Sequence, residues 1–355
     1  MQWEQDSALE LGLNWTSEIW TIDQMADFPV NHQLPVGWRS FALRRLHLHA
    51  RVRRAVQDYD VILVRYAPID LFGPFLPRRC REKCHFVFHT KTNEYLRSMK
   101  ALSGFHLTKL DEMLGRQMVR GARSLIGVTP EILEYERTRL RFNGRRLRPY
   151  PNGIHLPESA DSPVDRRAGS YKIIFVASRF FDWNGLETLL GSVRHVETMA
   201  SWELHLVGEL TPAQLRFCEN ERVAPHVRIH GSLPNATIST LLAEMDLSLG
   251  AFNLQSLNMR EACTLKVRES LGMGVPVYSG HADCAFPEQF PFYRVGPPEM
   301  STIINHAIVM RGARRDSVRA AARPFIDKKQ LLRDLWSQLA SHGGREAGAT
   351  RALDA

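Results

Sequence analysis

Residues 261–278, E-A-C-T-L-K-V-R-E-S-L-G-M-G-V-P-V-Y, contain two acids separated by seven residues, with a lysine between them. The two glycines predict the end of a short helix, and the run 275–278 predicts a strand directly after it. Glu261, at a loop tip, can accept hydrogen bonds from sugar hydroxyls, and Glu269, about two helical turns on, can chelate a ribose diol. The stretch therefore indicates a helix-to-strand unit of an α/β fold that carries ligand-binding groups. An amphipathic helix with solvated charges is the alternative.

The start of the same predicted helix favours an anion. Backbone N–H groups of residues 264–267 emerge there, beginning with Thr264 and Leu265, and a helix start attracts phosphate groups. Lys266 adds a full positive charge beside them. We therefore expect Thr264, Leu265 and Lys266 to contact a diphosphate.

Strand-like and helix-like runs alternate along the chain, which predicts parallel sheets covered on both faces. Predicted strands are 18–22, 59–64, 85–88, 124–128, 173–177, 203–207, 227–229, 247–249 and 275–278. Predicted helices are 2–11, 40–56, 108–120, 186–193 and 238–245. Residues 151–169, with their prolines and glycines, form the expected linker. Two Rossmann-like domains follow, 1–150 and 170–324.

Composition favours a globular protein and excludes a spanning one. The chain has 355 residues, 44% of them hydrophobic, which is enough for two sizeable cores. No apolar run approaches the ~20 residues of a membrane-spanning helix, and the start M-Q-W-E-Q-D is not a secretory signal. The five cysteines are odd in number and scattered, and they complete no metal-ligand set. We expect a cytoplasmic protein without structural disulfides or a bound metal.

Positive charge is concentrated in the first half of the chain. Residues 1–150 contain 24 Lys+Arg against 16 Asp+Glu, whereas residues 151–355 contain 22 of each, so the whole net charge of +8 lies in the first half. Six arginines fall within residues 39–54, interspersed with apolar residues at partly helical spacing. One interpretation is a basic helix that contacts anionic lipid, and the other is a solvated arginine face on a packed helix.

The motif 261–269 resembles the E-x7-E segment of retaining GT-B glycosyltransferases. It is most similar to the large family, family 4-like, that includes many bacterial polysaccharide and lipopolysaccharide enzymes. Further segments stand in that family's order and extend the resemblance over about residues 58–277. They are Y-P-N-G-I-H at 150–155, I-I-F-V-A-S-R-F-F-D-W-N-G at 173–185, W-E-L-H-L-V-G at 202–208, V-R-I-H-G-S-L at 227–233 and L-L-A-E-M-D-L-S-L at 241–249.

The resemblance implies two Rossmann-like domains that face each other across a cleft, with acceptor bound by the first and donor by the second. It also implies a last helix, residues 325–341, that crosses back to the first domain. The Gly- and Ala-rich residues 343–355 are expected to be a flexible tail. In this sequence the family's first strand and glycine-rich loop are expected to be missing from the amino-terminal domain.

By the family pattern, Glu261 meets the donor sugar, Glu269 the ribose, and Arg179 together with Lys266 the diphosphate. Asn184 stands where many members have a second cationic residue, a lysine, and it is expected to contact the donor. Backbone groups of a loop contact the nucleobase; its residues here are Gly231, Ser232 and Leu233. His89 ends a predicted strand and is expected to hydrogen-bond the donor sugar or the acceptor. A structural histidine is the plainer alternative.

The resemblance further implies transfer of a hexose-type sugar, with retention and without a metal or other cofactor, onto a glycan or lipid-linked acceptor. Surface polysaccharide synthesis at the inner face of the cell membrane is the expected setting. A non-catalytic sugar-nucleotide-binding or scaffold protein is the alternative, because of the missing first strand. A nucleic-acid binder would suit the pI near 9.4 but lacks any binding module, so no nucleic-acid partner is expected.

Overall fold

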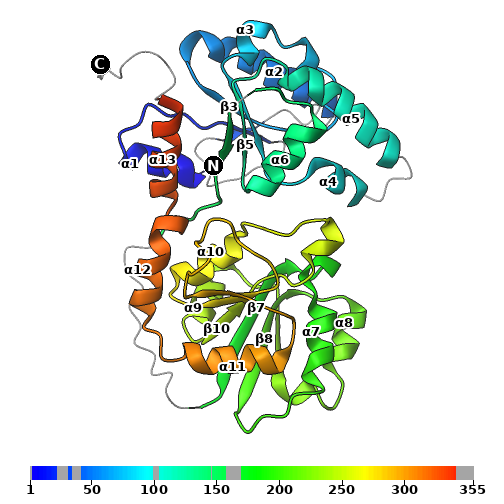
Figure 1. The fold of residues 1–355 in the computed structure, drawn as a ribbon, viewed down its shortest axis with the longest axis vertical. Helices are drawn as coiled ribbons and strands as arrows, with labels where there is room; N and C mark the ends of the chain where they lie inside the picture. The colour runs from blue at the N-terminus through cyan, green and yellow to red at the C-terminus, as the bar shows by residue number, and fades with distance from the viewer. Residues whose placement is uncertain are drawn as a thin grey trace. The chain divides into compact units, whose positions relative to one another are not determined.

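The computed structural model describes residues 2–21, 31–33, 41–98, 104–144, 146–156 and 169–340 (Figure 1). The chain divides into two compact units. Unit 1 comprises Met1–Tyr150 and Lys328–Ala355, and unit 2 comprises Pro151–Asp327. The predicted tail, 343–355, lies outside the described residues.

Unit 2 contains a six-stranded parallel sheet in the order β12-β11-β10-β7-β8-β9. Its strands are β7 (Tyr171–Arg179), β8 (Trp202–Glu209), β9 (Val227–Gly231), β10 (Leu247–Leu249), β11 (Val277–Ser279) and β12 (Tyr293–Val295). The chain adds β8 and β9 on one side of β7 and then returns to place β10 on its other side. This reversal is a topological switch point, where doubly wound sheets bind ligands at the carboxyl ends of their strands.

Helices cover both faces of this sheet because successive strand residues point to opposite sides. Ile173 and Phe175 pack with helices α7 (Leu186–Val193), α8 (Pro212–Cys218) and α11 (Met300–Met310). Ile174 and Val176 pack on the other face with α9 (Asn235–Leu242). The cluster of α10 (Leu265–Gly272) and α12 (Arg315–Ile326) also contains Val277 of β11. Figure 1 shows the three layers.

Unit 1 contains a four-stranded parallel sheet in the order β3-β4-β5-β6 and a separate two-stranded parallel sheet, β1-β2. The strands are β1 (Ile19–Thr21), β2 (Asn31–Gln33), β3 (Ile62–Arg65), β4 (Cys84–Phe88), β5 (Ser124–Gly127) and β6 (Leu147–Pro149). The helices are α1 (Gln2–Glu10), α2 (Phe41–Asp58), α3 (Arg78–Arg81), α4 (Thr92–Ser98), α5 (Gly104–Val119), α6 (Pro130–Arg139) and α13 (Lys328–Ala340).

The last helix belongs to the first unit. Leu335 and Leu339 of α13 pack with Ile126 of β5 and Tyr150. Lys328, at its start, donates to Glu4 Oε1 and to Tyr150 Oη, each at 3.3 Å. The predicted return of the chain to the first domain is therefore confirmed. The helix predicted over 325–341 is divided, however, because Asp327 has extended backbone angles and separates α12 from α13.

Several predicted boundaries need correction. Residues 147–149 form an edge strand rather than the start of irregular chain. The first residues of the expected linker, 151–156, pack within unit 2: Ile154 is buried and pairs with Asp327. The remaining strands and helices predicted from periodicity are present, with ends that differ by a few residues. The predicted fold class, two parallel α/β sheets with a returning helix, is confirmed.

Candidate functional site

Arg179 is the last residue of β7, next to the switch point. The pairing of β7 with β8 shifts register between Val176 and Arg179, and Gly208 of β8 lies against this irregularity. A Cβ at Gly208 would lie 2.0 Å from the Ala177 carbonyl oxygen, so only glycine permits the close approach. The Arg179 side chain is 51% exposed, and its Nη2 lies 3.6 Å from Glu209 Oε1. Its position at the strand end makes it accessible to an anionic ligand.

The turn after β7 is fixed by its own side chains. Asn184 is buried, and its Oδ1 accepts a 2.8 Å hydrogen bond from the backbone N–H of Phe181. Gly185 follows in the left-handed region at φ +73, and a Cβ there would lie 2.9 Å from Phe252 Cβ. Asn184, expected to contact the donor, thus uses its amide oxygen to close the turn.

The loop after β10 meets this turn. The backbone N–H groups of Phe252 and Asn253 donate to the carbonyls of Asn184 and Trp183 at 3.0 and 3.1 Å. The Asn253 amide also donates to the Asp182 carbonyl at 3.1 Å. The loops at the two sides of the switch point are therefore joined by three hydrogen bonds.

Glu261 lies farther along the same loop, in a fixed stretch of backbone. It pairs with Ala282 in a parallel bridge after β11, and the next N–H, of Ala262, donates to the Ala282 carbonyl at 3.1 Å. Gly280 lets the same two loops approach closely nearer the strands, since a Cβ there would lie 2.5 Å from Phe252 Cα. The Glu261 side chain is half-buried. Its backbone, in the loop after β10, is therefore held against the loop that follows β11.

Helix α10 begins four residues after Glu261. Thr264 is its N-cap residue but makes no side-chain capping hydrogen bond, and Leu265 is 40% exposed. Lys266 and Glu269 lie one turn apart and form a 3.0 Å ion pair, with side chains 37% and 28% exposed. Such a pair contributes about 0–1 kcal/mol to the free energy of unfolding, so a ligand can separate the two side chains at small cost.

A buried arginine supports this helix and was not predicted. Arg268 is fully buried and forms a bidentate ion pair with Asp283, with Nη2 donating to Oδ1 at 2.8 Å. Burial opposes its charge, but the hydrogen bonds that it donates to Asp283 hold the pKa of Arg268 above its ordinary value. Arg268 Nε also donates to the Asn152 carbonyl at 3.0 Å. The pair ties α10 to the loop after β11 and to residue 152.

Asn152 extends this support to the Glu261 loop. Its side-chain amide donates to the Cys263 carbonyl at 2.7 Å, and its backbone N–H donates to Cys263 Sγ at 3.0 Å. The Y-P-N-G-I-H segment that carries Asn152 is thus part of the site's framework. No sequence signal near Arg268 indicates Asp283, which is fifteen residues away along the chain.

The residues expected at the nucleobase lie at the carboxyl end of β9 and directly after it. Gly231 has φ +65, which favours glycine, although a Cβ there would meet nothing within 4 Å. Ser232 is exposed, and Leu233 is partly buried against the cluster of α9. These three residues lie at the same carboxyl edge as Arg179, two strands away in the sheet.

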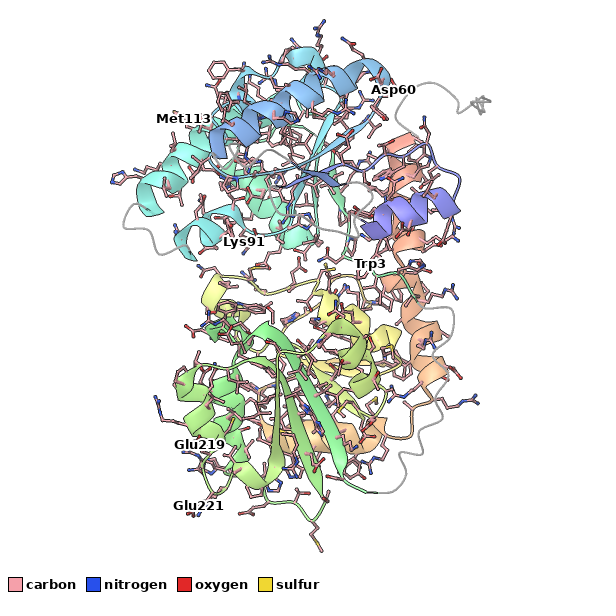
Figure 2. All side chains as sticks on the ribbon, turned by 180° about the vertical axis from the view of Figure 1, so that it is seen from behind. Trp3, Asp60, Lys91, Met113, Glu219 and Glu221 are labelled. Atoms are coloured by element: carbon pink, nitrogen blue, oxygen red, sulfur yellow. The ribbon has the colours of Figure 1, made fainter. Side chains whose placement is uncertain are left out.

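His89 lies in unit 1, whereas the other candidate residues lie in unit 2. It follows β4 and its side chain is exposed. Lys91, labelled in Figure 2, donates to Glu131 Oε1 at 2.8 Å, and Glu94 pairs with Arg97 at 3.0 Å. Two charged neighbours of His89 therefore already have ionic partners within unit 1.

The comparisons with known proteins agree with this architecture. Residues 171–290 match the family model described as "Glycosyl transferases group 1". A glycosyltransferase from Rickettsia africae ESF-5 is 12% identical, with 96% of this chain and 93% of that chain covered and a TM-score of 0.63. The fold is that of GT-B glycosyltransferases. No curated protein matches the sequence significantly.

Two further solved structures share the fold over most of their length. WaaG, a glycosyltransferase involved in lipopolysaccharide biosynthesis, is 16% identical, with 96% and 94% of the two chains covered and a TM-score of 0.63. Sucrose-phosphate synthase from Thermosynechococcus elongatus is 15% identical, with 94% and 91% covered and a TM-score of 0.61. The group 1 match falls on the unit that contains the switch point.

Proposed function

We propose that the chain is a retaining glycosyltransferase that moves a hexose-type sugar from a nucleoside diphosphate to a glycan or lipid-linked acceptor. One observation carries the proposal. Arg179 ends β7, and Glu261, Lys266 and Glu269 follow β10, so that two cations and two acids flank the switch point of one sheet. The group 1 match over residues 171–290 supports it.

Each group has a chemical role in this proposal. The Arg179 guanidinium and the Lys266 ammonium hold the diphosphate. The backbone N–H groups of Thr264 and Leu265 at the start of α10 also contact it. Glu269 accepts hydrogen bonds from the ribose hydroxyls, and Glu261 from those of the donor sugar. Asn184 closes the turn after β7 and so helps to position Arg179, which precedes that turn. The exposed His89 of unit 1 is assigned to the donor sugar or the acceptor.

Transfer proceeds on one face of the sugar. The bond from C1 to the diphosphate oxygen breaks, the acceptor oxygen bonds to C1 on the same face, and the departing phosphate takes the acceptor's proton. Arg179 and Lys266 stabilise the negative charge that develops on the leaving group. We propose that the reaction needs no divalent metal.

A product analysis tests the activity. The chain is incubated with UDP-, GDP- or ADP-sugars that carry a labelled hexose and with sugar acceptors, in the presence and absence of EDTA. The account expects labelled product with the donor's anomeric configuration, and equal rates with and without EDTA. An inverted product contradicts retention. Nucleotide-sugar binding without transfer or hydrolysis would favour the scaffold alternative.

We also propose that unit 1 contacts an anionic membrane surface through one patch. The patch consists of Leu43 and Leu46 of α2 and of Leu71 and Phe75 in the segment that follows β3, with side chains that are 40%, 49%, 50% and 74% exposed. Arg53 of α2 donates to the Phe75 carbonyl at 3.1 Å, which places the loop beside the helix. Exposed apolar side chains among arginines suit a lipid headgroup layer. No helix among the described residues is long and apolar enough to cross a bilayer.

Vesicle sedimentation tests this contact. Vesicles of phosphatidylglycerol and phosphatidylcholine should retain the protein, and vesicles of phosphatidylcholine alone should not. The double variant Leu46→Ser/Phe75→Ser should lose retention, whereas Met199→Ser, which changes a fully exposed methionine of unit 2, should keep it. Equal retention of both variants would contradict the proposed patch.

A further inference from the structure

An exposed aromatic ring stands at the carboxyl edge of β7. Phe181 is 48% exposed, although a phenyl ring is usually buried. Two other groups adjoin its ring: the Arg179 guanidinium is 5.9 Å from its centroid, and the Trp183 ring is stacked at 6.5 Å with an interplanar angle of 14°. The ring therefore adjoins the cation that we assign to the diphosphate.

The backbone beneath this ring is rigid. Phe181 N–H donates to Asn184 Oδ1 at 2.8 Å, and the Asn184 N–H donates back to the Phe181 carbonyl at 2.8 Å. Neither bond involves the phenyl ring, so the exposed side chain contributes nothing to closing the turn. A rigid turn that presents an aromatic ring costs little conformational entropy when a ligand binds.

Trp183 connects the ring to the loop that carries Glu261. It is half-buried and packs on the cluster of Ala251, Leu254 and Ala262, which form the inner side of that loop. Because Ala262 directly follows Glu261, the aromatic pair lies by the acid that we assign to the donor sugar. The residues assigned to the nucleobase lie two strands away, after β9.

We propose that Phe181, backed by Trp183, forms a platform for the apolar C–H face of a sugar ring. The inference rests on the proposed function and adds the contact that selects the sugar. The face of an aromatic ring is electron-rich and attracts the C–H groups of a pyranose. The sugar ring on the platform belongs to the donor or to the acceptor, and both sugars present the same apolar C–H face. In either case the platform contacts the sugar ring and not the nucleoside diphosphate.

Titration calorimetry separates the sugar from the nucleotide. The affinities of UDP and UDP-glucose, GDP and GDP-mannose, and ADP and ADP-glucose are measured for the wild type, Phe181→Ala, Phe181→Tyr and the exposed control Met199→Ala. The acceptor KM is measured for the same variants with the donor that binds. Melting without ligand checks that Phe181→Ala is folded, as the exposed ring predicts.

The platform predicts that Phe181→Ala binds the free nucleoside diphosphate as the wild type does, and that it loses about 10-fold in affinity for the matching nucleotide sugar. Phe181→Tyr and Met199→Ala should behave as the wild type. If the donor affinities are unchanged but the acceptor KM rises about 10-fold, the ring on the platform is the acceptor's.

An unchanged donor affinity together with an unchanged acceptor KM in Phe181→Ala overturns the platform and leaves the proposed function standing. A wild-type protein that binds none of the six nucleotides contradicts the proposed function, and the platform falls with it. Equal losses for UDP and UDP-glucose would also overturn the platform, since Phe181 would then act on the nucleotide part.

Discussion

Helix α10 carries two ion pairs that differ in burial. Lys266 and Glu269 are joined across one turn with both side chains partly exposed, whereas Arg268 and Asp283 are joined with both side chains fully buried. Arg268 lies between Lys266 and Glu269 in the sequence. The charges of Lys266 and Glu269 are therefore partly exposed to solvent, whereas the charge of Arg268 lies in the protein interior. Burial separates the cation that a ligand can reach from the cation that holds the helix in place.

The difference in burial also changes what each pair contributes. Removing one partner of a buried pair leaves an uncompensated charge in the interior and lowers stability strongly. An exposed pair adds little to stability, because water solvates each charge almost as well when the partner is removed. Arg268 is therefore expected to govern stability, and Lys266 to govern activity. The following predictions test this contrast, beginning with the largest effect.

Arg268→Ala should reduce the free energy of unfolding by about 3–5 kcal/mol, because Asp283 would be left buried and unpaired. Urea unfolding measures the change. The double variant Arg268→Met/Asp283→Leu should recover most of it, because it removes both charges and keeps apolar volume. A loss below about 1 kcal/mol in Arg268→Ala would mean that this pair is not the helix anchor.

Lys266→Ala should lower kcat about 10²–10³-fold, because the leaving diphosphate loses one stabilising charge. Its free energy of unfolding should change by no more than about 1 kcal/mol. Steady-state kinetics and urea unfolding of the same preparation measure both. Lys172→Ala, which removes a comparable exposed pair with Glu244, is the matched control and should change neither. A stable protein with undiminished kcat would remove Lys266 from the mechanism.

Acidification should weaken the buried region through His281. This histidine is 3% exposed and lies two residues before Asp283, and burial lowers its pKa below the ordinary value. Because the unfolded state binds the proton more readily, stability is full above the unfolded pKa of about 6.5 and falls as pH drops towards the folded pKa. His281→Gln should flatten this fall in urea unfolding between pH 7 and 5, and the exposed His195→Gln should not. Parallel pH profiles for all three proteins would show that His281 is not the cause of the loss of stability at low pH.

Much of the fold was predictable because its signals are local. The long buried strands and the helices between them follow from apolar runs and their spacing, as in β7 and α7. The edge strand β6 was missed because Leu147-Arg148-Pro149 is short and contains a proline, which sequence alone assigns to a loop. The division of the last helix at Asp327 has no strong sequence signal.

The site was predictable only in part. Arg179 could be placed at the carboxyl edge of the sheet because it follows a predicted strand, whereas Glu261 and Lys266 were assigned from the motif 261–269. Arg268 could not be told from a solvated helix charge, since its partner Asp283 comes from another loop. Asn184 occupies the position of a family cation, yet its burial assigns its amide oxygen to the turn. Pairings between distant segments depend on packing that no local pattern contains.

Thermal shifts with nucleotide sugars test the central claim, that unit 2 binds a sugar nucleotide at its switch point. UDP-, GDP- and ADP-glucose are added at millimolar concentration to the wild type and to Glu269→Ala. The account predicts that at least one donor raises the wild-type Tm, since a ligand at about 100 times its Kd adds about 2.7 kcal/mol of stability. It also predicts that Glu269→Ala abolishes the shift. No shift with any donor, or an equal shift in both proteins, would contradict the account.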